Sequence, residues 1–415
     1  MDIPKRRVKR SRVTRRRDQE PQESEIDSKD VGATASSVSE APTSTSKPAI
    51  TSGSSISKPR ISKPTWMKED DFQRRINAIQ KTEDLNESIN TPMASEDVSL
   101  KVAQLPKLTK QSKDEIVRDF YNIQTHNARK SKRVESPIYR LRSFNNCIKY
   151  ILIHKYGRHN GSVLDLGCGK GGDLAKWGLI NTQQYVGIDL SELSVKEAYS
   201  RYRKSRYDFG AIFVSGDAFN TPLPEILGEF EQDQVCHLQF DNISMQFCMH
   251  YAFSSEESVR QMLTNVSKSL KMGGMFVGTI PSSDFIKWKI KKHPGEKSWG
   301  NSLYRVTFPD TPPQDGNFEN PFGNVYNYFL VDAVDNVPEF IVPFEKFRGL
   351  CEEFGLRLRY KKGFFEVFRK EINNYFNFLP GPLVQSLRLN GGYGVEGEER
   401  DAVGFYLAFA FEKVA

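Results

Sequence analysis

The stretch Val163-Leu164-Asp165-Leu166-Gly167-Cys168-Gly169-Lys170-Gly171-Gly172-Asp173 decides the fold of this 415-residue chain. Ser162–Leu166 is a short apolar run that predicts a buried strand, and the glycines end it before a helical stretch over Leu174–Leu179. A glycine-rich loop between a strand and a helix is a typical binding site for a nucleotide-like ligand. Its spacing satisfies both G-x-G-x-x-G and G-x-G-x-G, which by itself leaves the ligand open.

Strands and helices alternate on both sides of this loop. Before it, apolar residues from Leu141 to Leu152 recur at helical spacing, with Ser136-Pro137 as a start and Gly157 as a stop. The later strands are predicted over Gln184–Asp189, Ala211–Ser215, Asp241–Phe247, Gly274–Ile280, Leu356–Tyr360 and Phe405–Phe411, with helices through about Tyr202 and over Ser255–Leu270. This alternation predicts an α/β, Rossmann-like fold with a mostly parallel seven-stranded sheet and helices on both faces. The segment Pro281–Pro343, dense in Pro, Asn, Phe and Tyr, is predicted to be an insertion after strand five.

Acidic residues near three strand ends narrow the ligand of the loop. Asp165 lies two residues before Gly167, where an acid would repel a pyrophosphate but favours a cationic sulfonium and ammonium. Asp189 ends the second strand, where a carboxylate accepts from both ribose hydroxyls, and Asp217 ends the third, placed to accept from an adenine amino group. Together they predict a class I methyltransferase that binds S-adenosylmethionine. The alternative is a protein that kept the loop but lost catalysis.

The net charge of +7 is concentrated at the N-terminus. Residues 1–17 hold nine Lys or Arg against one acid, whereas residues 18–415 carry 50 basic and 51 acidic residues. Two basic clusters with a short spacer predict a nuclear-import signal and thus a nuclear protein; the alternatives are a loose nucleic-acid contact or a solvated arm. The rest of residues 1–110 is rich in Ser, Thr, Pro, Lys and Glu, so we expect a disordered tail before one domain over residues 111–415. One short helix is predicted in that tail, around Lys68–Gln80.

Composition argues against two other classes of protein. The chain has no run of eighteen apolar residues, which argues against a membrane span. Its five cysteines are scattered without paired short spacings, which indicates free thiols rather than disulfides or a zinc site. We therefore expect no metal.

Several short motifs follow one another in a specific order. They are Ser136-Pro137-Ile138, Phe144-Asn145-Asn146-x-x-Lys149, the loop 165–173, Gln246-Phe247-x-x-His250-Tyr251-Ala252-Phe253, Gly278-Thr279-Ile280-Pro281, Val337-Pro338-Glu339 and Tyr406. Over about residues 112–415 this set resembles the mRNA cap guanine-N7 methyltransferases of the fungal-like nuclear type. In two departures from the family pattern, Phe120 precedes Tyr121-Asn122 where a histidine is common, and Cys147 follows the Asn pair where a tryptophan is common. Both concern the packing beside the site.

The resemblance implies a role for each matching residue. Besides Asp165, the residues implied to contact the methyl donor are Lys149, Gly167, Asp189, Asp217, Gln246 and Tyr251. Asn145 and Asn146 would bind the cap, and Lys170, Lys176 and Arg201 would lie on its phosphate side. The guanine pocket would consist of Phe247, His250, Tyr251, Pro281, Glu339 and Tyr406. The resemblance further implies capped mRNA as substrate, and RNA polymerase II and other capping enzymes as partners.

These residue types suit methylation of guanine N7. The N7 atom carries a lone pair and no proton, so no general base is required and no residue is expected to act as acid or base. Catalysis then depends on alignment and on electrostatic support for positive charge. The carboxylate of Glu339 would hold the guanine edge and favour the cationic product, while Phe247 and Tyr406 would stack on the base.

Each of these residues also has a structural interpretation. His250 would then be a hydrogen-bonded, partly buried histidine, Phe247 and Tyr406 plain core, and Glu339 a surface carboxylate. Lys176 and Arg201, expected on helix surfaces, would be merely solvated. The Asn145-Asn146 pair is locally unfavourable within a helix, which indicates a functional role.

Two rival functions remain. A methyltransferase for ribose oxygen or a protein side chain would place a Lys or an acid at the attack site, whereas strand four ends in Gln246-Phe247. A non-catalytic RNA-binding adaptor would dispense with donor binding, which the intact Asp165, Asp189 and Asp217 argue against.

Overall fold

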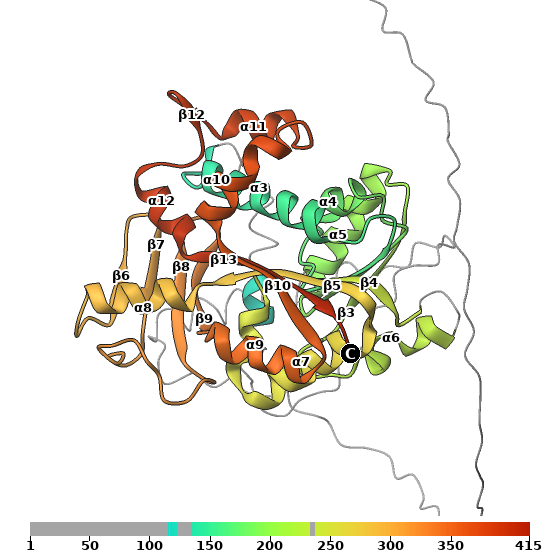
Figure 1. The fold of residues 1–415 in the computed structure, drawn as a ribbon, viewed down its shortest axis with the longest axis horizontal. Coiled ribbons are helices and arrows are strands. Elements are labelled where there is room, and N and C mark those ends of the chain that lie inside the picture. Colours follow the sequence, from blue (N-terminus) through green and yellow to red (C-terminus); the bar gives the residue numbers. More distant parts are fainter. Residues whose placement is uncertain (1–114, 116, 123–134, 233–236) are drawn as a thin grey trace, which may run out of the picture. The chain divides into compact units, whose positions relative to one another are not determined.

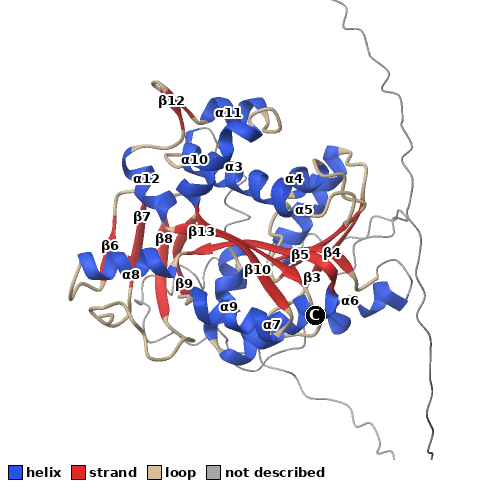
Figure 2. Ribbon diagram, viewed as in Figure 1, coloured by secondary structure: helices blue, strands red, loops and turns tan. Residues whose placement is uncertain are grey.

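A computed structural model describes residue 115 and residues 117–122, 135–232 and 237–415. The predicted tail over residues 1–110 and the helix predicted around residues 68–80 lie outside the described residues. The described part is built on one large sheet with helices on both faces (Figure 1, Figure 2).

The large sheet has seven strands in the order β10-β13-β5-β4-β1-β2-β3. Its strands are β1 (Ser162–Leu166), β2 (Gln184–Asp189), β3 (Gly210–Ser215), β4 (Phe240–Gln246), β5 (Leu270–Pro281), β10 (Leu356–Gly363) and β13 (Tyr406–Lys413). The first five pair in parallel, and β13 runs antiparallel to both β5 and β10. The predicted mostly parallel seven-stranded sheet and Rossmann-like fold class are therefore confirmed.

Helices cover both faces of this sheet. They are α3 (Tyr139–Tyr156), α4 (Leu174–Gly178), α5 (Glu192–Ser205), α6 (Leu223–Gln232), α7 (Glu256–Ser269), α9 (Phe344–Glu353), α10 (Phe364–Tyr375), α11 (Gly381–Ser386) and α12 (Gly397–Gly404). Figure 2 shows α3, α4, α5 and α10 on one face and α7 and α9 on the other. Each face buries its own apolar cluster, as expected for a parallel sheet that is covered on both sides.

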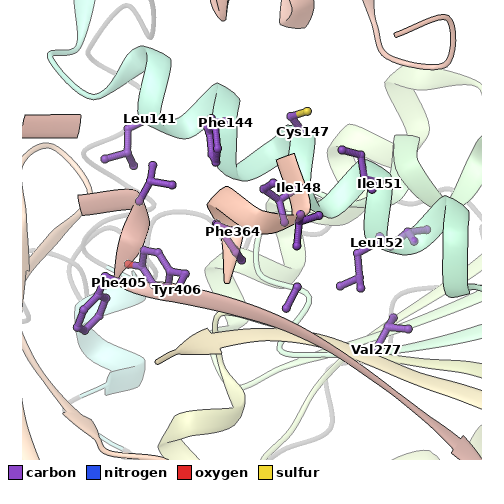
Figure 3. Close-up of a cluster of buried hydrophobic side chains, with 14 of the residues drawn as sticks. Leu141, Phe144, Cys147, Ile148, Ile151, Leu152, Val277, Phe364, Phe405 and Tyr406 are labelled. Carbon is purple, nitrogen blue, oxygen red and sulfur yellow. The ribbon is translucent and has the colours of Figure 1, made fainter. Parts of the chain in front are cut away.

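Helix α3 packs along the sheet through the apolar stripe that its sequence predicts. Leu141, Phe144, Ile148, Ile151 and Leu152 are each at most 1% exposed. Figure 3 shows these side chains lying toward Phe364 and Tyr406 and toward Val277 of β5. The opposite side of α3 is thereby left to carry polar side chains.

The predicted strands agree with the structure to within one to four residues at each end. One position differs in a way that concerns the site. β3 ends at Ser215, so Asp217 lies in the following loop rather than at the strand end. There its Oδ1 accepts from the backbone N–H groups of Phe219 and Asn220, at 3.0 and 3.2 Å. Asp217 therefore holds the turn that enters α6.

The segment between β5 and α9 lies outside the large sheet, as predicted, but it has regular structure of its own. It contains α8 (Ser283–Lys292) and an antiparallel sheet of β6 (Ser298–Gly300), β7 (Tyr304–Thr307), β8 (Val325–Leu330) and β9 (Val334–Phe340). A two-stranded ribbon, β11 (Arg388–Leu389) and β12 (Gly392–Tyr393), follows α11. Among the described residues, no helix is long and apolar enough to cross a membrane.

Candidate active site

The glycine-rich loop follows β1 and is shaped by left-handed backbone. Gly167, Gly169 and Gly171 have φ values of 74°, 51° and 66°, which favour glycine. A Cβ on Gly167 would lie 2.6 Å from the Sγ of Cys248, whereas a Cβ on Gly169 would meet no atom within 4 Å. The loop therefore packs on one side against Cys248, two residues after the end of β4, and is open on the other, where a ligand fits.

Asp189 holds this loop from the end of β2. Its Oδ2 accepts from the backbone N–H of Gly169 at 2.8 Å, and its Oδ1 accepts from that of Ser191 at 2.9 Å. Burial raises the pKa of Asp189 to about 6, against the effect of these two hydrogen bonds. Each carboxylate oxygen retains a lone pair, so Asp189 can still accept from a ligand hydroxyl.

Asp165 is anchored inside the sheet. It is 1% exposed, and its Oδ2 accepts from the Tyr185 hydroxyl at 2.6 Å. Burial raises the pKa of Asp165 to about 7, and the negative charge of Asp173 adds to the rise. Asp165 is thus fixed near the carboxyl end of β1, just before the loop, and its contact with the methyl donor stays a prediction.

Lys149 and Lys176 meet at Asp173, the last residue of the quoted stretch. Their ammonium nitrogens lie 2.7 and 2.8 Å from Asp173 Oδ1. Burial alone would raise the pKa of Asp173, but the two ammonium groups outweigh burial and hold this pKa well below its usual range. No role was predicted for Asp173 from the sequence, although it is the last residue of the glycine-rich loop.

The expectation that Lys176 lies on a helix surface is wrong, and its place on the phosphate side of the cap stays a prediction. Its side chain is 3% exposed, and its Nζ also donates to the carbonyl of Gly172 at 2.8 Å. Burial lowers the pKa of Lys176 to about 8, despite the nearby carboxylate of Asp173. Because α4 is short and packs inward, its lysine clamps the loop instead of facing solvent.

Lys149 also connects the glycine-rich loop to the residues predicted to form the guanine pocket, of which Phe247 is the first. Its Nζ lies 5.7 Å from the ring centroid of Phe247, a distance at which a cation is attracted to an aromatic face. Phe247 follows β4 with a φ of 61°, which is rare for a bulky residue and is typical of functional sites. Its ring meets that of Tyr406 edge to face, with centroids 4.9 Å apart. Phe247 and Tyr406 therefore form one aromatic wall rather than separate parts of the core.

Glu339 of β9 is another of the residues predicted to form the guanine pocket, and it is not a surface carboxylate. It is 5% exposed, its Oε2 accepts from the Tyr326 hydroxyl at 2.8 Å, and its Oε1 lies 3.5 Å from Nε2 of His250. His250 is 2% exposed, and neither of its ring nitrogens has a hydrogen-bond partner in the structure. A buried polar group without a partner is costly, so the interpretation of His250 as a hydrogen-bonded core residue is wrong.

The remaining pocket residues come from the ends of neighbouring elements. His250 and Tyr251 lie on the 3₁₀ helix η2 (Met249–Ser254), and Pro281 ends β5 opposite Tyr406 in the strand register. The Tyr406 hydroxyl donates to that of Tyr328 at 3.0 Å. Tyr326 and Tyr328 were missed by the sequence analysis, although buried and half-buried residues alternate along β8.

A helical segment over residues 117–122 contacts both the residues around Asp189 and the residues around Tyr251. The hydroxyl of Tyr121 lies 3.1 Å from that of Tyr251. The Asn122 Oδ1 accepts from the hydroxyl of Ser191, two residues after Asp189, at 2.6 Å. This segment therefore bridges the end of β2 and η2.

The remaining residues that were predicted to bind the donor or the cap lie on β4, α3, the glycine-rich loop and α5. Gln246, the last residue of β4, accepts from the Thr279 hydroxyl at 3.1 Å and donates to that of Ser244 at 3.3 Å. Asn145 and Asn146 are half-buried on α3, and the Oδ1 of Asn145 is buried without a hydrogen-bond partner. Lys170 and Arg201 are half-buried on the loop and on α5.

Sequence comparison places the chain in a family. Residues 105–414 match the family model described as the mRNA (guanine-N(7))-methyltransferase domain. A Meyerozyma guilliermondii protein named mRNA cap guanine-N(7) methyltransferase is 52% identical over 338 residues, which are 74% of this chain and 58% of that protein. Proteins of the same name from Saccharomyces cerevisiae and Schizosaccharomyces pombe are 47% and 46% identical, over 72% of this chain and 70% and 82% of theirs.

The chain spans only 58% of the length of its Meyerozyma guilliermondii and Lodderomyces elongisporus relatives. Among solved structures, an S-adenosylmethionine-dependent methyltransferase from Clostridium acetobutylicum is similar with a TM-score of 0.37 and 15% identity, over 71% of this chain and 99% of that one. With a family model that covers three quarters of its length, the chain belongs to the mRNA (guanine-N(7))-methyltransferase domain family.

Proposed function

We propose that this protein is an enzyme that transfers a methyl group from S-adenosylmethionine to guanine N7 of the 5′ cap of mRNA. The observation that carries the proposal is that the buried Glu339 and His250, and the aromatic wall of Phe247 and Tyr406, lie next to a glycine loop that Asp189 holds. The named relatives support the choice of the cap as acceptor.

The donor site suits S-adenosylmethionine. The open side of Gly169 leaves room for a ligand, and Asp189 binds the backbone N–H of the same residue. Asp165 lies in β1 just before the loop, and Asp217 follows β3. When bound, S-adenosylmethionine supplies an electrophilic methyl group on a positively charged sulfur. Asp189 would accept from the ribose hydroxyls, Asp217 from the adenine amino group, and Lys149 and Gln246 would border the amino-acid end of the donor.

The acceptor pocket suits guanine and its cationic product. A guanine edge carries N–H donors, and the Oε1 of Glu339, which lies 3.5 Å from Nε2 of His250, would accept from them while Tyr326 holds the Oε2. The ring nitrogens of His250 have no hydrogen-bond partner among the described residues, and the bound base would supply one. Methylation leaves a positive charge on the ring, which the buried carboxylate and the aromatic wall would stabilise.

The geometry favours this acceptor over a hydroxyl. A ribose oxygen must lose a proton, which calls for a Lys or an acid at the point of attack. The residues at the end of β4 are Gln246, engaged with Thr279 and Ser244, and Phe247. Lys149, which lies 5.7 Å from the ring centroid of Phe247, is paired with Asp173.

We further propose that the protein works in the nucleus beside RNA polymerase II and other capping enzymes. The support is the basic sequence of residues 1–17 and the family to which the chain belongs.

The first prediction concerns the product. Incubation of the full chain with methyl-labelled S-adenosylmethionine and RNA ending in an unmethylated guanosine cap should label the cap guanine at N7. The measurement is digestion of the RNA followed by chromatography of the released cap. Label on ribose, or no label at all, would contradict the proposed function.

The second prediction concerns Asp189. Asp189→Asn should weaken donor binding by about 1.5–3 kcal/mol, the scale of hydrogen bonds to charged groups. Because the pKa of Asp189 is about 6, the wild-type carboxylate is ionised at pH 7.5 and becomes protonated as the pH falls through 6. Donor affinity, measured calorimetrically, should therefore fall between pH 7 and pH 5, and this fall should be shallower in the variant.

Asp208, exposed after α5, provides a matched control. Asp208→Asn should keep the donor affinity and pH profile of the wild type. Equal profiles for Asp189→Asn and the wild type would show that the end of β2 does not bind the donor.

The third prediction separates the acceptor pocket from the donor site. Glu339→Gln should slow methylation of capped RNA by about 10- to 100-fold, since it removes the charge that favours the cationic product. Donor affinity should change little, because Asp189 and the loop are intact. The exposed Glu353→Gln serves as the control. Parallel losses of turnover and donor affinity in Glu339→Gln would indicate misfolding instead.

The fourth prediction concerns the basic N-terminus. Deletion of residues 1–17 should shift a fluorescently tagged chain from the nucleus to the cytoplasm and leave the methylation rate of the purified protein nearly unchanged. A large decrease in turnover would assign these residues to RNA binding at the site.

A further inference from the structure

Helix α8 exposes a tryptophan outside the site described above. Of the three tryptophans that the structure describes, Trp177 and Trp299 are at most 4% exposed, whereas Trp288 is 43% exposed. An indole ring gains stability by burial, and nothing in the packing of α8 requires this ring at the surface. The exposed indole ring is therefore available to stack on a ligand that has an aromatic face.

Lysines surround the exposed indole. Lys291 and Lys292 are exposed, and the Nζ of Lys292 lies 4.2 Å from the centroid of the Trp288 ring. Neither lysine forms an ion pair with a described carboxylate. Lys287 donates to the neutral side chain of Asn317 at 2.5 Å, close to Asp315. The one acid within α8, Asp284, pairs with Lys361.

The helix dipole accounts for only part of this pattern. Cations in the last turn of a helix interact favourably with its C-terminal end, which explains Lys291 and Lys292 as ordinary surface residues. It does not explain an exposed indole between them and Lys287. An aromatic face flanked by cations is the combination that binds single-stranded nucleic acid, because bases stack and phosphates meet the lysines.

Helix α8 is fixed to the wall of the guanine pocket. It follows Pro281 after one residue, Ser282, whose backbone N–H donates to the carbonyl of Phe405 at 2.8 Å. Farther along, the buried Lys289 lies 2.6 Å from Asp401, which also accepts from the Tyr304 hydroxyl at 2.7 Å. Trp288 is six residues beyond Ser282, about 9 Å along the helix axis at the usual rise per residue. Figure 1 shows α8 continuing from the end of β5.

We propose that Trp288, Lys291 and Lys292 bind the single-stranded RNA that follows the cap, with a base stacked on the indole and phosphates on the two lysines. The proposal rests on the proposed cap methylation, because only a capped RNA held in the pocket places its following nucleotides beside α8. An RNA chain of several nucleotides should then bind better than the cap alone.

The kinetic test compares a cap dinucleotide with a capped RNA of roughly 20 nucleotides. Trp288→Ala should raise KM for the capped RNA about 10-fold, the scale of one lost base stack, and leave KM for the dinucleotide and kcat unchanged. Trp288→Phe should restore most of the loss because it retains an aromatic face. Tyr393→Ala, which removes another aromatic side chain that is 43% exposed, should leave both KM values unchanged.

The salt dependence of binding separates stacking from charge. With uncapped, fluorescein-labelled RNA, Lys291→Ser/Lys292→Ser should lower the slope of log affinity against log salt by about 1.4, or 0.7 per phosphate contact on a single strand. Trp288→Ala should weaken binding without changing the slope. Lys268→Ser/Lys346→Ser removes the same charge from α7 and α9, where both lysines are exposed, and should have little effect.

The outcomes distinguish this proposal from the one on which it rests. Equal KM values of wild type and Trp288→Ala for the capped RNA would overturn the RNA surface, as would equal changes with the RNA and the dinucleotide. Loss of uncapped-RNA binding in the α8 variants, in a protein that methylates no capped RNA, would support the surface and overturn the proposed function. Unaltered RNA binding together with weaker binding of a poly-glutamate peptide would assign α8 to an acidic protein and also overturn the proposal.

Discussion

The buried contact of Lys149 and Lys176 with Asp173 is the interaction on which the site depends. A carboxylate removed from water is strongly destabilising unless it is paired, and here two ammonium groups lie within 2.8 Å of one oxygen. Lys149 comes from α3, Asp173 from the end of the donor loop and Lys176 from α4. The contact therefore fixes the loop to the helix that carries Asn145 and Asn146, so the two halves of the site share one anchor.

The group formed by Glu339, His250 and the aromatic wall follows a complementary principle, since its polar groups are positioned but incompletely satisfied. Tyr326 orients Glu339 through one oxygen, while both nitrogens of His250 and the Oδ1 of Asn145 have no hydrogen-bond partner within the part of the chain that the structure describes. Such groups are costly in an otherwise packed interior. A ligand that supplies their partners is bound more tightly for that reason, and the aromatic wall of Phe247 and Tyr406 limits which ligand fits.

Much of this could be predicted because short-range patterns determine it. The 3.6-residue stripe of α3 and the apolar runs of β1 and β2 placed those elements closely, and the positions of the glycine loop and of Asp189 at neighbouring strand ends followed from them. The burial of Lys176 could not be predicted, because a lysine on a short helix is usually solvated and only packing against α3 encloses it. The sheet of β6 to β9 was missed although each strand pairs with the next one along the chain and β8 shows an alternation. β6 and β7 have only three and four residues, which is too short for a clear alternating pattern. The assignment of the acceptor came from the family motifs and not from any periodicity.

The topology explains why donor and acceptor residues meet at all. From β1 the chain order runs to β2 and β3 on one side, while β4, β5 and β13 lie on the other. Open α/β sheets bind ligands at such a reversal, beyond the carboxyl ends of the strands. The loop after β1 and Phe247 after β4 are therefore neighbours, and Cys248 shows how closely: its Sγ lies 2.6 Å from where a Cβ on Gly167 would be. A side chain at residue 167 would push the two halves apart, so Gly167 keeps the loop next to the chain that follows β4, while the loop is open two residues later, at Gly169.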